Sequence, residues 1–284
     1  MANKKLKAPV NIPVSKIHPF EGNPYKVLDD DEMNNLICSI QEQGVLTPII
    51  IRPIENTDEY EVISGHRRLH ATVKAGIKEV PAFIYAVTRD EAAIMLVDSN
   101  LHREHILPSE KAFAYKLKLE ALSHQGQTSR QLGEKWSVTQ ISESVNDSER
   151  QIHRYIRLTY LIPELLDLVD EEKIALTPAV ELSYLTDEEQ YYLLGTIEEE
   201  DRTPSLSQAV RFKKLSQAGE LSDESIETIM QEDKANQKPM FKVSMERLQK
   251  VAPKVKDKDF EDFVLKACEH YYRYLQRQRN RDAR

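Results

Sequence analysis

Strand-like sequence patterns occur only in the first third of this chain. Between Val10 and Ala86, short runs rich in β-branched residues alternate with runs that carry the 3.6-residue period of an amphipathic helix. From Arg89 onward only the helical period recurs, broken by proline, glycine and polar connectors. The sequence therefore predicts an α+β protein, with an N-terminal α/β domain followed by an all-helical remainder.

Local signals place the elements of the α/β domain. Acidic residues at Asp31 and Glu32 favour a helix start, and Gly44 and Gly76 stand where helices end. The predicted strands are Val10 to Ile17, Thr47 to Ile54, Tyr60 to Ser64 and Val80 to Ala86, and the predicted helices are Asp31 to Gln43 and His66 to Ala75. The chain is thus expected to pass through Gly65 from a strand directly into a helix.

The later elements divide into two further regions. Predicted helices cover Arg89 to Asp98, Leu107 to Ser123, two short segments within Thr139 to Ile162, a helix opened by a capping box at Thr186 and Glu189, and Lys258 to Arg279. Polar runs at 124–135 and 231–238 predict a loop and a linker. We therefore expect three domains, over residues 1–105, 106–230 and 239–284.

The charge distribution leaves a nucleic-acid partner open despite an acidic sum. The formal net charge of the 284 residues is -8, but Pro163 to Asp201 alone holds 13 acidic residues and one lysine. The rest of the chain therefore carries +4. Because one segment holds all the excess acidity, that segment can face away from a phosphate backbone. The acidic total does not exclude a DNA-binding protein.

Cysteine usage and hydropathy exclude other classes. Cys38 and Cys268 each lie in an apolar helical pattern without a second cysteine or a histidine at ligand spacing, which predicts buried thiols rather than a disulfide or a metal site. No stretch approaches the ~20 apolar residues of a membrane span, and the first residues lack the apolar core of a signal peptide. We expect a cytoplasmic protein without a membrane partner.

The run Ser64-Gly65-His66-Arg67-Arg68 has the residue types of an anion site. A strand-to-helix junction collects unpaired backbone N–H groups at the positive end of a helix dipole, and two arginines add charged donors. Glycine allows the close backbone approach that a phosphate needs. The alternative is an ordinary turn followed by an arginine-rich, solvated helix face.

A second polar cluster, Ser99-Asn100-Leu101-His102-Arg103, follows the helix that is predicted to end at Asp98. An asparagine can hold a hydrated divalent cation, while an arginine neutralises phosphate oxygens. The alternative is a polar helix terminus. A third stretch, Gly44 to Arg52, combines a helix stop with a buried strand and by itself predicts only scaffold.

A helix-turn-helix is predicted between Thr139 and Leu158. The first short helix covers Thr139 to Val145, and the second covers Ser148 to Leu158 with Ser148 as its cap. In the second helix three arginines share one face and two polar residues lie nearby, namely Arg150, Arg154 and Arg157 with Gln151 and His153. This pattern suits the phosphates and base edges of a major groove. The alternative is a solvated face of a helical bundle.

Taken in this order, the segments resemble the ParB family of centromere-binding partition proteins. The matching pieces are GVLTPIIIR, EVISGHRRLHA, SNLHREHILPSEKAFAYK and the helix-turn-helix, so the resemblance covers roughly Val10 to Leu185. The connector HQGQTSRQLGEKW and the run RQIHRYIRLTYLIPELLDLV look most like family members carried by plasmids and conjugative elements of Gram-positive bacteria.

The resemblance implies a fold, ligands and a mode of action. Family members are dimers with a ParB/sulfiredoxin-like N-terminal domain that binds CTP and Mg2+. They load at a palindromic double-stranded DNA site through the helix-turn-helix and close into a CTP-controlled clamp, and a ParA-type ATPase is a further expected partner. By position, the implied nucleotide residues are Gly44, Thr47, Pro48, Gly65, His66, Arg67, Arg68, Asn100 and Arg103, with Asn100 also at the metal. The implied DNA residues are Ser148, Arg150, Gln151, His153, Arg154 and Arg157.

Two departures from the family pattern bear on activity. The family commonly has Glu where His66 stands, and Glu or Thr where Ser99 stands, so CTP hydrolysis is expected to be slow or absent. The alternative function is a nucleotide-independent DNA-binding transcriptional regulator on the same fold. A sulfiredoxin-like enzyme is excluded because Ser64 to His66 leaves no nucleophilic thiol at the turn.

The last predicted helix carries an aromatic stripe, formed by Phe260, Phe263, Val264, Ala267, Tyr271 and Tyr274. The stripe is longer than a small unit can bury, which favours a symmetric partner and a homodimer. Packing against Met240 to Val251 of the same chain is the alternative.

Overall fold

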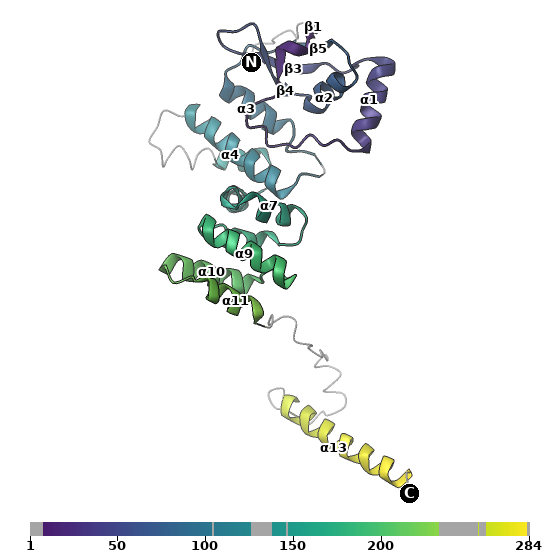
Figure 1. Ribbon diagram of the computed structural model, residues 1–284, viewed down its shortest axis with the longest axis vertical. Coiled ribbons are helices and arrows are strands. Elements are labelled where there is room, and N and C mark those ends of the chain that lie inside the picture. Colours follow the sequence, from purple (N-terminus) through teal and green to yellow (C-terminus); the bar gives the residue numbers. More distant parts are fainter. Residues whose placement is uncertain are drawn as a thin grey trace. The chain divides into compact units, whose positions relative to one another are not determined.

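The computed structural model of the chain describes residues 8–103, 105–125, 138–145, 147–232, 255 and 260–282. Its residues up to Glu232 belong to one compact unit, and the last helix belongs to a second unit that begins at Asp233. The first unit combines a small sheet with helices on both faces and a helical region that follows it (Figure 1). The boundary predicted near residue 105 remains a prediction.

Five short strands form a mixed sheet at the N-terminal end of the first unit. They are β1 (Val10–Pro13), β2 (Ile17–His18), β3 (Ile49–Pro53), β4 (Tyr60–Ser64) and β5 (Glu79–Ile84), in the spatial order β1-β5-β3-β4-β2. β1 pairs antiparallel with β5, and β3 pairs antiparallel with β4. β3 and β5 are parallel, as are β2 and β4. The sheet therefore places the end of β4, and the glycine that follows it, beside the start of β3.

The single strand predicted over Val10 to Ile17 is wrong. The structure divides it into β1 and β2, separated by the short 3-10 helix η1 (Val14–Lys16). Pro13 has no N–H to donate to a ladder and its φ of -58° suits a turn, so the first strand ends there. Because β1 and β2 pair at opposite edges of the sheet, η1 carries the chain from one edge to the other.

Helices cover both faces of the sheet because side chains alternate along each strand. Val62 of β4 packs in the same cluster as Leu69 of α2 (His66–Lys74). The next residue, Ile63, packs with Leu96 of α3 (Arg89–Asp98) on the opposite face. α1 (Asp31–Gln43) packs on α2 through Met33, which is fully buried. The start of α2 is therefore held from the sheet side and from α1.

The sequence predicts the helical character of the region after the sheet. The elements of this region are α4 (Pro108–Gln125), a helix over 138–144, α6 (Glu149–Arg157), the 3-10 helix η2 (Leu158–Tyr160), α7 (Pro163–Asp170), α8 (Leu176–Leu182), α9 (Asp187–Glu200), α10 (Leu206–Ala218), α11 (Asp223–Gln231) and, in the second unit, α13 (Phe260–Asp282). The sequence does not predict the positions of α7, α8, α10 and α11. The predicted capping box of Thr186 and Glu189 is present at the start of α9. One cluster built on Leu165, Leu182 and Phe212 joins α7 to α11. Within the first unit, the helices from α4 to α11 follow one another away from the sheet (Figure 1).

Two predictions about exposure and loops need correction. Cys38 and Cys268 are both exposed, so the predicted buried thiols are wrong. In α1 the buried side chains are Met33 and Ile40, and Cys38 lies on the opposite side of that helix. The predicted polar loop begins later than expected because α4 includes His124 and Gln125, and 126–135 lies outside the described residues, as does the linker from 233 to 238. Among the described residues, no helix is long and apolar enough to cross a membrane.

Candidate nucleotide and DNA sites

Gly65 forms the junction between β4 and α2 and adopts a backbone conformation that requires glycine. Its φ is +103° and its ψ is 28°, in the left-handed region. A Cβ atom at this position would lie 2.8 Å from Cγ2 of Ile49 and 3.1 Å from Nη2 of Arg68. The glycine therefore lets the chain turn against β3 and keeps the first turn of α2 open to a ligand.

Arg68 closes a loop over this turn. Its Nη1 atom donates to the carbonyl oxygen of Thr47 at 2.6 Å and to that of Pro48 at 2.8 Å. These two residues belong to the loop that begins at Gly44, which ends α1 with a φ of +73°. We call the group of Gly44, Thr47, Pro48, Gly65, His66 and Arg68 the cradle. The structure thus brings together two segments that the sequence predicted separately.

His66 is the residue of the cradle whose ring has a buried nitrogen and a lowered pKa. Its Nε2 atom is buried and has no hydrogen-bond partner among the described residues. Burial, and secondarily the positive charge of Arg103, lowers the pKa of His66 to about 4. The imidazole is therefore neutral near pH 7. A buried nitrogen without a partner is destabilising by ~1–3 kcal/mol, and a ligand with an acceptor atom could supply the missing hydrogen bond.

The Ser99–Arg103 cluster lies after α3, near His66. The guanidinium of Arg103 sits 5.5 Å from the ring centre of Tyr25, a residue that the sequence did not single out. Asn100 is buried, and its amide nitrogen donates to the carbonyl of Leu96 at 2.7 Å. The side-chain oxygen is therefore the atom of Asn100 that could act as a metal ligand. Among the described residues, no three His, Cys, Asp or Glu side chains form a metal cluster.

Arg67 does not contact the loop carbonyls that hold Arg68 but pairs with acidic residues at the start of α1. Its Nη2 atom is 3.4 Å from Asp30 and 3.2 Å from Glu32, both at the start of α1. These ion pairs are partly exposed, so they are weak and can exchange for an anionic ligand. In the structure, Arg67 therefore faces the acidic start of α1 rather than the carbonyls that hold Arg68.

The two helices of the predicted helix-turn-helix are present. The first covers 138–144, and α6 begins after Ser148, whose hydroxyl accepts a hydrogen bond from the backbone nitrogen of Gln151. Ile152 is fully buried and anchors α6 against α4. The turn residue Asn146 lies outside the described residues.

The three arginines of the predicted DNA-binding face of α6 differ in their contacts. Arg157 donates to the hydroxyl and the carbonyl oxygen of Ser183, at 3.0 and 2.6 Å, and stacks on the rings of Tyr160 and Tyr184. Arg154 donates to the hydroxyl of Thr177 at 2.6 Å and also to Gln151. In contrast, Arg150 and His153 are exposed. The structure thus connects two of the three arginines to α8 and its C-terminal end.

Comparison with known proteins decides the family. The family model of the ParB N-terminal domain matches residues 2–101. The chromosome-partitioning protein Spo0J of Thermus thermophilus is 30% identical over 202 residues, which cover 71% of this chain and 70% of that protein. The chain belongs to the ParB family of partition proteins. The nucleoid occlusion protein of Listeria innocua is 32% identical over 193 residues, which cover 67% of this ParB-family chain and 63% of that protein.

Two solved structures of one further protein are also similar to this chain. The C-terminally truncated ParB of Caulobacter crescentus, complexed to its centromeric parS site, is 18% identical, covers 78% of this ParB-family chain and 98% of its own, and has a TM-score of 0.41. The same protein complexed with CTP-gamma-S is 22% identical, covers 64% and 94% of the two chains, and has a TM-score of 0.32. The N-terminal α/β domain is of the ParB/sulfiredoxin-like type and the helical region follows it.

Proposed function

We propose that this ParB-family chain is a sequence-specific DNA-binding partition protein whose hold on DNA is controlled by CTP bound in the cradle with Mg2+. The observation that carries the nucleotide half of the proposal is the unpartnered, buried Nε2 atom of His66 beside the left-handed Gly65. The identity of the nucleotide is taken from the ParB family, to which the chain belongs.

The residues present fit a triphosphate. The first backbone N–H groups of α2 lack helical partners and lie at the positive end of its dipole, where an anion is stabilised. Nε2 of a neutral His66 can donate one further hydrogen bond, and Arg103 can leave the Tyr25 ring to contact a phosphate oxygen. A magnesium ion held between phosphates needs few protein ligands, and the side-chain oxygen of Asn100 would supply one.

The DNA half of the proposal places the major groove against the N-terminal part of α6. Arg150 and His153 are exposed there, and Ser148 and Gln151 lie at the same helix end. Arg154 can contact DNA if it leaves Thr177, whereas Arg157 is tied to Ser183 through two hydrogen bonds. We therefore assign direct DNA contacts to the first turns of α6 and support of that helix to Arg157.

The proposed binding does not imply rapid turnover of CTP. Hydrolysis needs a group that orients or deprotonates water, and His66 stands where the family commonly has a glutamate. With its pKa lowered to about 4, a buried imidazole carries no charge at neutral pH and offers no carboxylate to a metal-bound water. We expect bound CTP to be hydrolysed slowly or released intact. We expect His66→Glu to raise the rate of CTP turnover and to preserve CTP binding.

Calorimetric titration with CTP, ATP, GTP and UTP in the presence of Mg2+ tests the nucleotide half. We expect CTP to bind most tightly, and Arg103→Ala to weaken it by about tenfold or more because a charge-assisted hydrogen bond is lost. Arg89→Ala is the matched control, since Arg89 lies on α3 and pairs with Glu21 outside the cradle. Absence of binding by all four nucleotides would instead support the nucleotide-independent regulator.

A homodimer through α13 completes the proposal. Several large apolar side chains of this helix are exposed in the single chain, among them Phe263, Leu265, Tyr271 and Tyr272. A second copy would bury them and would match a two-fold palindromic site. Truncation after Gln237 is expected to halve the mass measured by light scattering, and an unchanged mass would place the dimer contact in the first unit.

A further inference from the structure

A row of polar side chains on α4 connects the end of α3 to the DNA-reading helices. Lys111, Tyr115 and Lys118 are spaced four and three residues apart, so they share one face of α4. Their partners are Asp98, Ser144 and Asp147. We call these six residues the α4 seam.

Lys118 is the most buried charged member of the α4 seam. Only 3% of its surface is exposed, and its Nζ atom lies 2.5 Å from Oδ1 of Asp98 and 2.8 Å from Oγ of Ser144. Asp98 is the last residue of α3, directly before the Ser99–Arg103 cluster. Ser144 is the last residue of the first DNA-reading helix. One buried ammonium group therefore joins the nucleotide loop to the helix-turn-helix.

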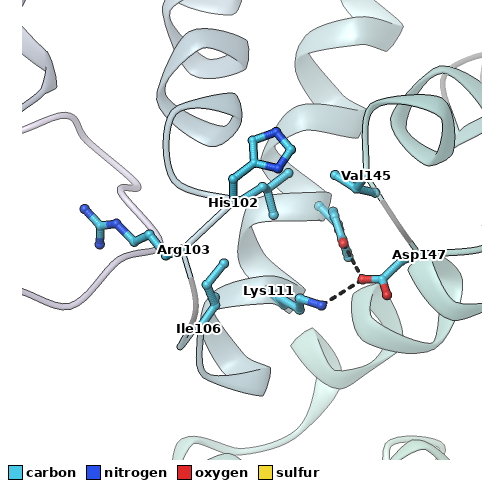
Figure 2. Close-up of a pocket in the computed structure, with 8 residues that line it drawn as sticks. His102, Arg103, Ile106, Lys111, Val145 and Asp147 are labelled. Atoms are coloured by element: carbon cyan, nitrogen blue, oxygen red, sulfur yellow. Dashed lines mark hydrogen bonds and ion pairs between the residues drawn. The ribbon is translucent and has the colours of Figure 1, made fainter.

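The other end of the α4 seam holds the turn before α6. The carboxylate of Asp147 accepts hydrogen bonds from Lys111 at 2.8 Å and from the Tyr115 hydroxyl at 2.5 Å (Figure 2). Burial by itself would raise the pKa of Asp147, but these two donors hold it below its usual value. Because Asp147 directly precedes Ser148, its two bonds help to set where α6 begins.

A pocket lies beside the Asp147 end of the α4 seam. Its volume is about 350 Å³, and it is lined by Leu101, His102, Arg103 and Ile106 from the nucleotide side and by Lys111, Tyr115, Val145 and Asp147 from the DNA side (Figure 2). A close-packed apolar contact would resist any change in the loop, because its separation would expose a dry core. Directional polar bonds beside a cavity allow the loop to shift while the links are broken or remade.

We propose that Lys118 is a positioning residue that transmits the state of the nucleotide loop to the helix-turn-helix. The Lys118 side chain is buried whereas that of Asp98 is 47% exposed. A buried ammonium group is costly unless it is paired and hydrogen-bonded, so the directional bonds of Lys118 are the property that an apolar residue could not replace. The inference rests on the proposed function, because it requires that CTP and DNA bind to the same chain. It adds the residues through which one ligand affects the other.

The test compares Lys118→Met with Lys116→Met in the full chain. Both substitutions remove one positive charge from α4, but Lys116 lies outside the α4 seam and faces the Tyr160 ring. Fluorescence anisotropy measures affinity for a duplex that the wild-type protein has selected from a randomised pool, with and without CTP and Mg2+. We define the coupling factor as the ratio of these two affinities.

We expect Lys118→Met to bind DNA alone and CTP alone within about twofold of wild type, while its coupling factor falls roughly fivefold or more toward one. Lys116→Met should keep the wild-type factor. Equal factors in Lys118→Met and wild type would overturn the inference and leave the proposed function intact. A wild-type factor of one would overturn both.

A second variant covers the case in which Lys118→Met does not fold. Ser144→Ala removes only the hydroxyl that Lys118 reaches on the DNA side and leaves the bond to Asp98 in place. Its coupling factor should fall in the same direction by a smaller amount. An unchanged factor in Ser144→Ala would contradict a link through the first DNA-reading helix.

Discussion

The cradle and α6 both present arginines at a helix, but the arginines are used differently. In the cradle, Arg68 is fixed by the carbonyls of Thr47 and Pro48, and the group without a partner is a histidine nitrogen. On α6, the arginine nearest the helix start is exposed, and those further along bind α8 or its end. The arginines that look alike in the sequence therefore divide into side chains that build a site and side chains that are available to a ligand.

A charged residue near a binding site need not touch the ligand. Arg68 and Arg157 each donate to a backbone carbonyl at 2.6 Å, a bond that fixes a loop or a helix. Their removal should act first on stability. His66 and Arg150 make no such contact with a carbonyl among the described residues, and their removal should act first on the ligand.

Gly65→Ala should have the largest effect. The new Cβ would meet Ile49 and would require a strained φ, so we expect a loss of about 3 kcal/mol in the free energy of unfolding and no nucleotide binding. Gly76→Ala is the control, because Gly76 also has a positive φ but no atom within 4 Å of the added Cβ. It should lose only about 1 kcal/mol. Urea unfolding measures both, and equal losses would contradict a crowded cradle.

The pH dependence of stability should report His66. Because its pKa is lowered to about 4, the unfolded chain binds more protons than the folded chain below about pH 6.5, so stability is lost as the pH falls through this range. We expect about 2 kcal/mol of the loss between pH 7.5 and pH 5 to disappear in His66→Gln. Exposed His153→Gln should keep the wild-type loss. Identical profiles for wild type and His66→Gln would show that His66 is not buried as a neutral ring.

Arg157→Ala should mainly lower stability, whereas Arg150→Ala should mainly weaken DNA binding. Loss of two hydrogen bonds and of stacking on Tyr160 and Tyr184 predicts a decrease of about 2 kcal/mol in unfolding free energy for Arg157→Ala. Arg150→Ala should change stability by less than about 0.5 kcal/mol and weaken DNA binding by ~1–3 kcal/mol. If Arg150→Ala binds DNA as wild type does at every salt concentration, the assignment of α6 to the groove is wrong.

Thr177→Val should have a small effect on both stability and DNA binding. It removes one exposed acceptor from Arg154 and keeps the shape of the side chain, so we expect a loss of about 0.5 kcal/mol. The released guanidinium would then be available to DNA, which predicts unchanged or tighter binding in anisotropy measurements. Weaker DNA binding with unchanged stability would show instead that Thr177 orients Arg154 for its contact.

Local sequence signals predicted most of the elements and the cradle's glycine. Gly65 was expected at a strand-to-helix junction, and the structure gives it the positive φ that explains why glycine stands there. The same approach missed Tyr25 and Lys118, because their roles depend on residues far away in the chain. It was wrong about Cys38, whose helix has a narrower buried stripe than its apolar pattern indicated.

By itself the sequence determined most of the strands and helices of the α/β domain, where several helices begin, and which side chains share a helix face. These properties follow from backbone sterics, capping and periodicity, which act over a few residues. Only the tertiary structure decided that Arg157 meets Ser183, that Arg68 reaches the loop before β3, and that Nε2 of His66 has no partner in the described part of the chain. Periodicity specifies the face on which a side chain lies but not the element that covers this face, and that element decides whether a charge is available for a ligand.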